Sequence, residues 1–147
     1  MEGAVDDFVQ ELKKQIIEET KAAYGEIAYQ RWRNPLFKGA MDNPDAFARL
    51  SGGCGDTMEI YLKFENNRVK EASYQTDGCG SSNVCGSFAA EMSIGRSPDQ
   101  LLEITEDAIS EKVGGLPKDD EQCALLAAQT IHMALNAWLN RPETPDG

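Results

Sequence analysis

Residues 57–76 carry a hydrophobic pattern with a period of two, which differs from the helical patterns on either side. Apolar and polar residues alternate over 57–64, and a less regular alternation follows over 68–76. This period is typical of strands with one covered face, and the intervening Asn66-Asn67 pair is typical of a turn. We therefore predict a two-stranded hairpin, which is marginal alone and needs another strand or packed helices.

Helical signals cover most of the remaining chain. Apolar residues of 4–32 recur at steps of three and four, as in an amphipathic helix that Asn34-Pro35 should end. A loop should follow as far as Gly53. Beyond the hairpin, helices are predicted at about 81–95, after Ser97, after Thr105 and at about 120–140.

Length and charge narrow the class of protein. The 147 residues fit one domain, 1–147, with a loose tail at 141–147. A net charge of -11 repels phosphate backbones, so nucleic acid is not an expected partner. No apolar run is long enough to cross a membrane, and the opening Met-Glu-Gly does not resemble a secretion signal. We therefore expect a cytoplasmic protein that does not bind membranes.

The sequence contains four cysteines, which in a reducing compartment are metal ligands or reactive thiols more often than disulfide partners. Cys54 lies among glycines that leave room beside its sulfur. Cys79 and Cys123 are expected near helix N-termini, where a thiolate is stabilised and can bind metal or attack sulfur. Taken singly, each could instead be a small buried apolar residue. The paired knuckles of a structural zinc module are absent from the sequence.

Three cysteine motifs resemble, in order and spacing, those of the IscU/NifU N-terminal scaffold family, and the opening segment resembles that of the family too. The resemblance covers about 24–140 and implies an α+β fold, with a small three-stranded antiparallel sheet packed against helices and the third strand from about 46–52. The matching segments are Gly53-Cys54-Gly55-Asp56, Asp77-Gly78-Cys79-Gly80-Ser81-Ser82, Leu116-Pro117 with Cys123-Ala124-Leu125-Leu126-Ala127, and Tyr24-Gly25-Glu26 through Arg33-Asn34-Pro35 to Gly39.

The resemblance also implies a function and a site. Cys54, Cys79 and Cys123 would accept sulfur as persulfide from a cysteine desulfurase and hold a transient [2Fe-2S] cluster, with Asp56 as the fourth ligand of iron. The cluster would then pass to apo iron-sulfur proteins, so the chain would be a carrier rather than an enzyme. Zinc could bind the same four groups. One carboxylate among thiolates suits a site that must release its cargo.

Two positions depart from the family pattern. Gln122 stands where the family has histidine before the third cysteine, and glutamine cannot exchange a proton near neutral pH. The sole histidine, His132, should lie roughly opposite Cys123 on its helix, at the surface. Acids at 119–121 follow Leu116-Pro117-Lys118 where many relatives carry a motif for an Hsp70-type chaperone, which puts that partnership in doubt.

Cys85 and residues 1–22 are additions to the family core. Cys85 should not share a helix face with the start of its helix, so we expect a buried packing residue, with a fourth ligand or sulfur relay as the alternative. Residues 1–22 lengthen the first helix, which we expect to pack on its own domain. A homodimer or partner contact through this helix is the alternative.

Two other functions remain open at this stage. The first is a zinc-bound sulfur acceptor that works with a cysteine desulfurase as a sulfur-transfer partner. The second is a purely structural zinc domain, which would unfold when its metal was removed. The missing knuckles and the glycines around Cys54 argue against the second.

Overall fold

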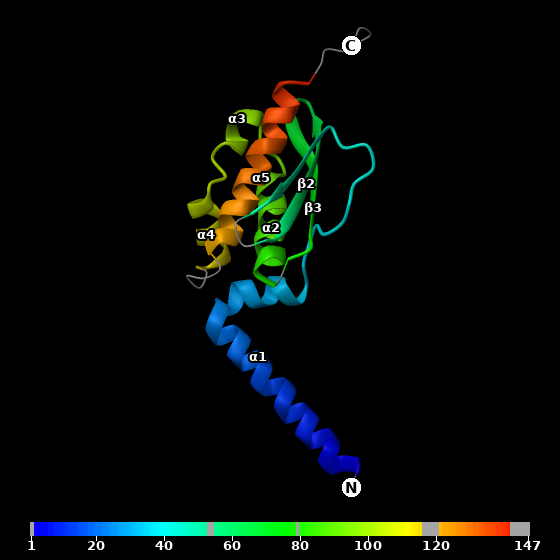
Figure 1. The fold of residues 1–147 in the computed structure, drawn as a ribbon, viewed down its shortest axis with the longest axis vertical. Helices are drawn as coiled ribbons and strands as arrows, with labels where there is room; N and C mark the ends of the chain where they lie inside the picture. The colour runs from blue at the N-terminus through cyan, green and yellow to red at the C-terminus, as the bar shows by residue number, and fades with distance from the viewer. Residues whose placement is uncertain (1, 53–54, 79, 116–120, 142–147) are drawn as a thin grey trace.

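The computed structural model describes residues 2–52, 55–78, 80–115 and 121–141, drawn as ribbon in Figure 1. The predicted tail at 141–147 and the acids at 119 and 120 lie almost wholly outside these residues. The elements in chain order are α1 (Glu2–Arg33), β1 (Ala46–Ser51), β2 (Thr57–Glu65), β3 (Arg68–Thr76), α2 (Gly80–Ser93), α3 (Pro98–Leu101), α4 (Glu106–Val113) and α5 (Glu121–Leu139).

The sheet has three antiparallel strands in the order β1-β2-β3, as predicted. The hairpin turn lies at Asn66 and Asn67, which both have positive φ, at 55° and 62°. Asparagine tolerates that left-handed backbone better than most residues, and tight hairpins need it at both central positions. The strand expected near 46–52 is confirmed by β1.

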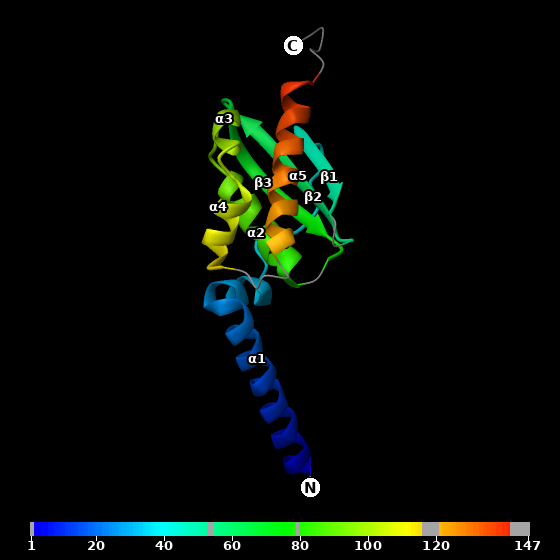
Figure 2. The same cartoon turned by 60° about the vertical axis from the view of Figure 1, so that its left-hand side comes forward.

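One face of the sheet is covered by α2 and α5, and α4 packs on these helices on the side away from the sheet (Figures 1 and 2). The core lies between these layers and includes Ile60 and Leu62 of β2 and Tyr74 of β3, none of which is exposed. The predicted helix starts are confirmed at Ser97, which forms a capping box with Gln100, and at Thr105.

Gly86 lets α2 lie directly on β3. A Cβ atom at this position would stand 2.5 Å from Cδ2 of the buried Tyr74 ring. The Tyr74 hydroxyl donates to Asn83 Oδ1 on the same helix at 3.1 Å, and burial raises the pKa of Tyr74 to about 12. The strand and the helix are therefore held in one arrangement, which also sets the position of the first turn of α2.

Cys85 is fully buried in the core cluster, in keeping with the packing role predicted for it. It lies on α2 beside core residues such as Val84 and Ala89. In the described part of the chain, no helix is long and apolar enough to span a bilayer.

The first helix differs from the continuous, domain-covering helix predicted from its periodicity. Gly25 has φ 83° and ψ 167°, which interrupts α1. Residues before Gly25 run away from the domain as a projecting arm, whereas those after it lie across the end of the domain (Figures 1 and 2). Phe8 and Leu12 on the arm are 68% and 46% exposed. The helix predicted from the periodicity is thus present, but Gly25 changes its direction.

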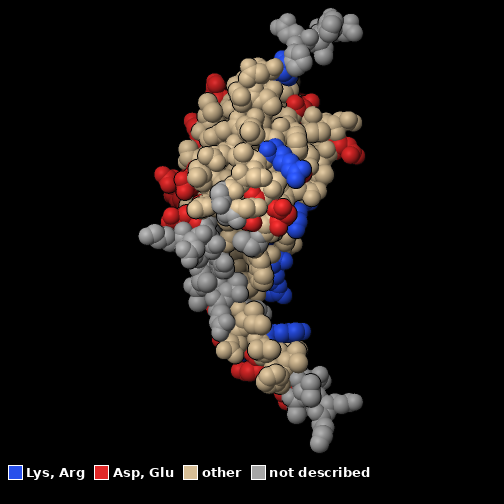
Figure 3. All heavy atoms as spheres, in the orientation of Figure 1, with Lys and Arg blue, Asp and Glu red and all other residues tan. Residues whose placement is uncertain are grey.

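The surface charge is unevenly distributed. Acidic side chains gather over α3 and α4 in Figure 3, where Asp99, Glu103, Asp107 and Glu111 are exposed. This face would repel phosphate groups.

Deletion of residues 1–22 should change the free energy of unfolding by less than about 0.5 kcal/mol, because the arm lies away from the core. Thermal or urea unfolding of the truncated and full chains measures this difference. A large loss of stability would show that the arm packs on its own domain after all. Sedimentation of both chains tests the homodimer alternative, since a dimer held by the arm would become a monomer on truncation.

Candidate functional site

The first turns of α2 and α5 lie at the same end of the domain, beside the last part of α1 (Figures 1 and 2). The chain between β1 and β2 reaches the same place, because Asp56 contacts the start of α2 through Ser82. Described residues from the three predicted cysteine motifs, namely Asp56, Ser82 and Cys123, therefore converge here. The convergence follows from the packing of α2 and α5 side by side on one face of the sheet.

Asp56, Ser82 and Cys123 form one hydrogen-bonded cluster. The Ser82 hydroxyl donates to Asp56 Oδ2 at 2.6 Å, and Ser82 Oγ lies 3.4 Å from Cys123 Sγ. A serine hydroxyl has one proton, so with that proton on Asp56 the Cys123 thiol is the donor of the second bond. Ser82 is 0% and Cys123 4% exposed, whereas Asp56 is half-buried. The cluster thus joins a carboxylate and a thiol through a buried hydroxyl.

The side chains of this cluster lie so close to residue 78 that only glycine fits there. A Cβ atom there would stand 2.5 Å from Asp56 Oδ2 and 2.6 Å from Ser82 Oγ. Two hydrogen bonds from backbone N–H groups to side chains hold the loop. Gly78 N donates to Thr76 Oγ1 at 3.0 Å, and Thr57 N donates to Asp77 Oδ1 at 2.7 Å. The glycine before Cys79 therefore lets the carboxylate and the hydroxyl meet.

The loop that bears Cys54 turns at Gly55, which has φ 89°. Gly52 N donates to Asp56 O at 2.9 Å and Gly55 N donates to Gly52 O at 3.1 Å, which closes the turn. Glycine adopts this left-handed backbone without steric cost. The turn directs Asp56 toward α2.

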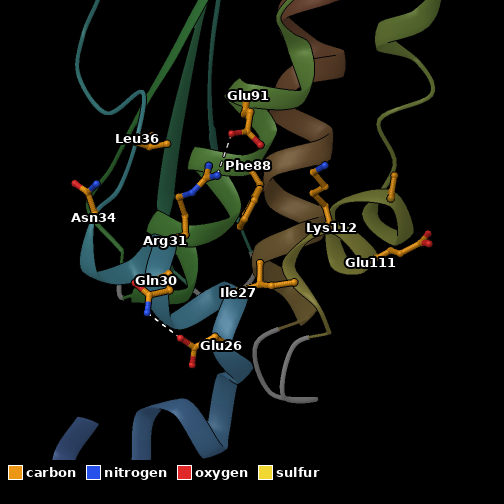
Figure 4. Close-up of a pocket in the computed structure, with 11 residues that line it drawn as sticks. Glu26, Ile27, Gln30, Arg31, Asn34, Leu36, Phe88, Glu91, Glu111 and Lys112 are labelled. Carbon is orange, nitrogen blue, oxygen red and sulfur yellow. Dashed lines mark hydrogen bonds and ion pairs between the residues drawn. The ribbon is translucent and has the colours of Figure 1, made fainter. Parts of the chain in front are cut away.

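The end of α1 covers the start of α2. Trp32 packs so closely on Gly80 that a Cβ atom there would stand 2.5 Å from the indole Nε1. Arg31 anchors this end of α1, because its guanidinium donates to Glu91 Oε1 at 2.9 Å and to Ser87 Oγ at 3.0 Å, and stacks on Phe88. Figure 4 shows Arg31, Phe88 and Glu91 lining a groove of about 1010 Å³ between α1, α2 and α4. An indole is thereby held beside the Cys79 loop.

The structure brings together two of the four predicted ligands, Asp56 and Cys123. The other two, Cys54 and Cys79, lie outside the described residues, although Gly78, the neighbour of Cys79, stands at this cluster. Among the described residues, no group of three or more histidine, cysteine, aspartate or glutamate side chains could hold a metal ion. The ligand role of all four residues stays a prediction.

Gln122 and His132 lie on different faces of α5. Gln122 is exposed in the first turn. His132 is partly exposed, and its Nε2 is enclosed without a hydrogen-bond partner in the described part of the chain, so the surface position predicted for it is confirmed only in part. It lies at the edge of the exposed face of α5, between the buried Ile131 and Met133, which is 46% exposed.

Sequence reasoning assigned no role to Ser82 or Trp32. Ser82 belongs to the second cysteine motif, three residues beyond Cys79, and such a spacing places two residues on one side of a helix turn. That spacing was the available signal. Trp32 had no such signal, because its contact with Gly80 depends on where α1 ends in space.

The sequence matches the family model described as "NifU-like N terminal domain" over residues 23–145. The chain belongs to the NifU-like N-terminal domain family. The match begins close to the break in α1 at Gly25, so the projecting arm lies almost wholly outside the shared domain.

Among members of known name, the "Iron-sulfur cluster assembly scaffold protein IscU 1" of Archaeoglobus fulgidus is 34% identical over 113 residues, which cover 76% of this chain and 74% of that protein. The "Iron-sulfur cluster assembly scaffold protein IscU" of Aquifex aeolicus is 29% identical over 119 residues, covering 79% and 76%. A solved NifU-like N-terminal structure from Brucella abortus has a TM-score of 0.64 at 20% identity, and the match covers 84% of this chain and 99% of that one. This last likeness confirms the fold.

Gly78→Ala should lower the free energy of unfolding by about 1–3 kcal/mol, because its Cβ would overlap Asp56 and Ser82. In an Asp56→Ala background the loss should be smaller, since the nearest overlapping atoms are gone. Urea denaturation of the single and double variants measures the coupling. Gly86→Ala is the matched control, whose overlap with Tyr74 should be indifferent to Asp56→Ala. Strict additivity of Gly78→Ala and Asp56→Ala, within about 0.5 kcal/mol, would contradict the described contact.

Proposed function

We propose that this chain is a scaffold on which iron-sulfur clusters are assembled and from which they pass to apo-proteins. The observation that carries the proposal is the cluster of Asp56, Ser82 and Cys123, which brings together one described residue from each of the three cysteine motifs. Membership of the NifU-like N-terminal domain family supports it, and so do two relatives that are named iron-sulfur cluster assembly scaffold proteins. In this role the protein is a carrier and catalyses no reaction of its own.

The proposed ligands are Cys54, Cys79, Cys123 and Asp56, and the cargo is a [2Fe-2S] cluster. Thiolates are the usual protein ligands of such clusters, whereas a carboxylate is a harder and weaker partner for iron and sulfide. A set of three thiolates and one carboxylate holds the cluster while leaving one side easier to open. Half-burial of Asp56 beside the buried Cys123 fits this asymmetry.

The proposed sulfur source is a cysteine desulfurase that carries a persulfide. A thiolate of this chain attacks the terminal sulfur of that persulfide, a new S–S bond forms on this chain, and the donor leaves as a thiolate. This transfer needs no oxidant. Conversion of the bound sulfur to sulfide needs two electrons, for which we propose an external thiol or one-electron donor.

A reducing compartment, the cytoplasm, suits these steps, because oxidised thiols cannot bind iron. The two cysteines in the described part of the chain, Cys85 and Cys123, form no disulfide.

Anaerobic reconstitution with ferrous iron and sulfide tests the proposal. Wild type should gain a visible absorption spectrum with equal amounts of iron and sulfide, and Cys123→Ser should lose or strongly weaken it. Cys85→Ser is the matched control, since Cys85 is equally buried but lies in the core, and it should leave both spectrum and stability of the cluster unchanged. Asp56→Ala should slow the loss of the cluster, because the most labile ligand is gone.

Absence of a cluster on wild type would overturn the scaffold proposal. Tight zinc binding in its place, with faster turnover of a cysteine desulfurase, would instead establish the zinc-bound sulfur acceptor. Faster cluster loss from Asp56→Ala would contradict the role given to the carboxylate, and an effect of Cys85→Ser equal to that of Cys123→Ser would show a sulfur relay through Cys85.

A further inference from the structure

We propose that Ser82 is a positioning residue of the assembly site, whose hydroxyl holds the Asp56 carboxylate, beside the Cys123 sulfur, in the orientation in which it binds a metal ion. The inference rests on the proposed function, because it assumes that these two side chains are ligands. It adds a residue outside the ligand set on which metal affinity depends.

The geometry of the hydroxyl is suited to this role. Ser82 Oγ is 2.6 Å from Asp56 Oδ2 and 3.4 Å from Cys123 Sγ, so one atom contacts both ligands. A carboxylate that binds a metal through one oxygen can keep a hydrogen bond on the other, and such outer partners orient the ligand. With Oδ2 held by Ser82, Oδ1 of Asp56 is the oxygen left to bind the metal.

Ser82 can fix its partners because its own position is fixed. It is fully buried in the first turn of α2. One turn further along the same side of the helix, Gly86 rests on the ring of Tyr74, and before it Gly80 carries the indole of Trp32. Because the helix is packed at both of these positions, the Ser82 hydroxyl has a fixed position. Asp56 lies on a loop, so its orientation depends on this hydroxyl.

A buried serine can instead have no role beyond its own helix, because its hydroxyl can donate to a backbone carbonyl one turn back. Ser93, on the same helix and also fully buried, does this by donating to Ala89 O at 2.8 Å, one turn back. Thr130 does the same on α5, where its hydroxyl donates to Leu126 O at 2.6 Å. Ser82 instead bonds to residues from two other parts of the chain, which a self-satisfying hydroxyl does not require. Ser93 is therefore a matched control.

The test is an anaerobic titration of the full chain with Co²⁺ alone, followed through the visible bands that report the ligand geometry of the ion. Ser82→Ala should weaken Co²⁺ binding by about 10- to 100-fold, as removal of such outer partners does in other metal sites, and should change the shape of the bands. Ser82→Thr keeps the hydroxyl and should restore most of the affinity. Ser93→Ala should bind as wild type does.

Equal Co²⁺ affinity and equal spectra for Ser82→Ala and Ser93→Ala would overturn the inference, and so would a Ser82→Thr variant as weak as Ser82→Ala. The proposed function fails separately, if wild type forms no cluster with iron and sulfide. A wild type that binds no Co²⁺ would overturn the inference together with the metal site on which it rests.

Discussion

The structure depends on the close packing of α2 against β3. Gly86 has no side chain, so the helix rests on the Tyr74 ring, and the Tyr74 hydroxyl is bonded to Asn83 on that helix. This contact sets where the helix starts. Its first turn then meets Asp56 from the β1–β2 connection and Cys123 from α5. Gly86 in the core and Gly78 at the site thus have the same function, because each lets neighbouring side chains approach the backbone closely.

The chemistry of the site follows from the different environments of its two described ligand candidates. Cys123 is buried in the first turn of α5, where its sulfur lies 3.4 Å from Ser82 Oγ. Asp56 is half-buried on a loop and held by Ser82. One ligand candidate is a soft sulfur on a helix, and the other is a hard oxygen on a loop. Such a pair suits a protein that must hold its cargo and later release it.

Local signals made much of the fold predictable, and contacts between distant residues account for the rest. The hairpin was predictable because its alternation and its Asn66-Asn67 turn are encoded within a short segment. β1 was not apparent from periodicity, because Phe47 on its outer face is apolar, packs on Tyr61 and obscures the alternation. Gly25 gave no sign that it would redirect α1. Asp56 and Cys123 were predicted from the family motifs, whereas Ser82 acquires its role only from contacts 26 and 41 residues away.

Mössbauer spectroscopy of the chain reconstituted with ⁵⁷Fe and sulfide tests the central claim most directly. If three thiolates and Asp56 hold a [2Fe-2S] cluster, one iron has an all-sulfur environment and the other has an oxygen ligand. Wild type should then show two iron signals of equal area, and Asp56→Ala should alter one of them while leaving the other. No cluster signal, or a pair of signals untouched by Asp56→Ala, would contradict the account.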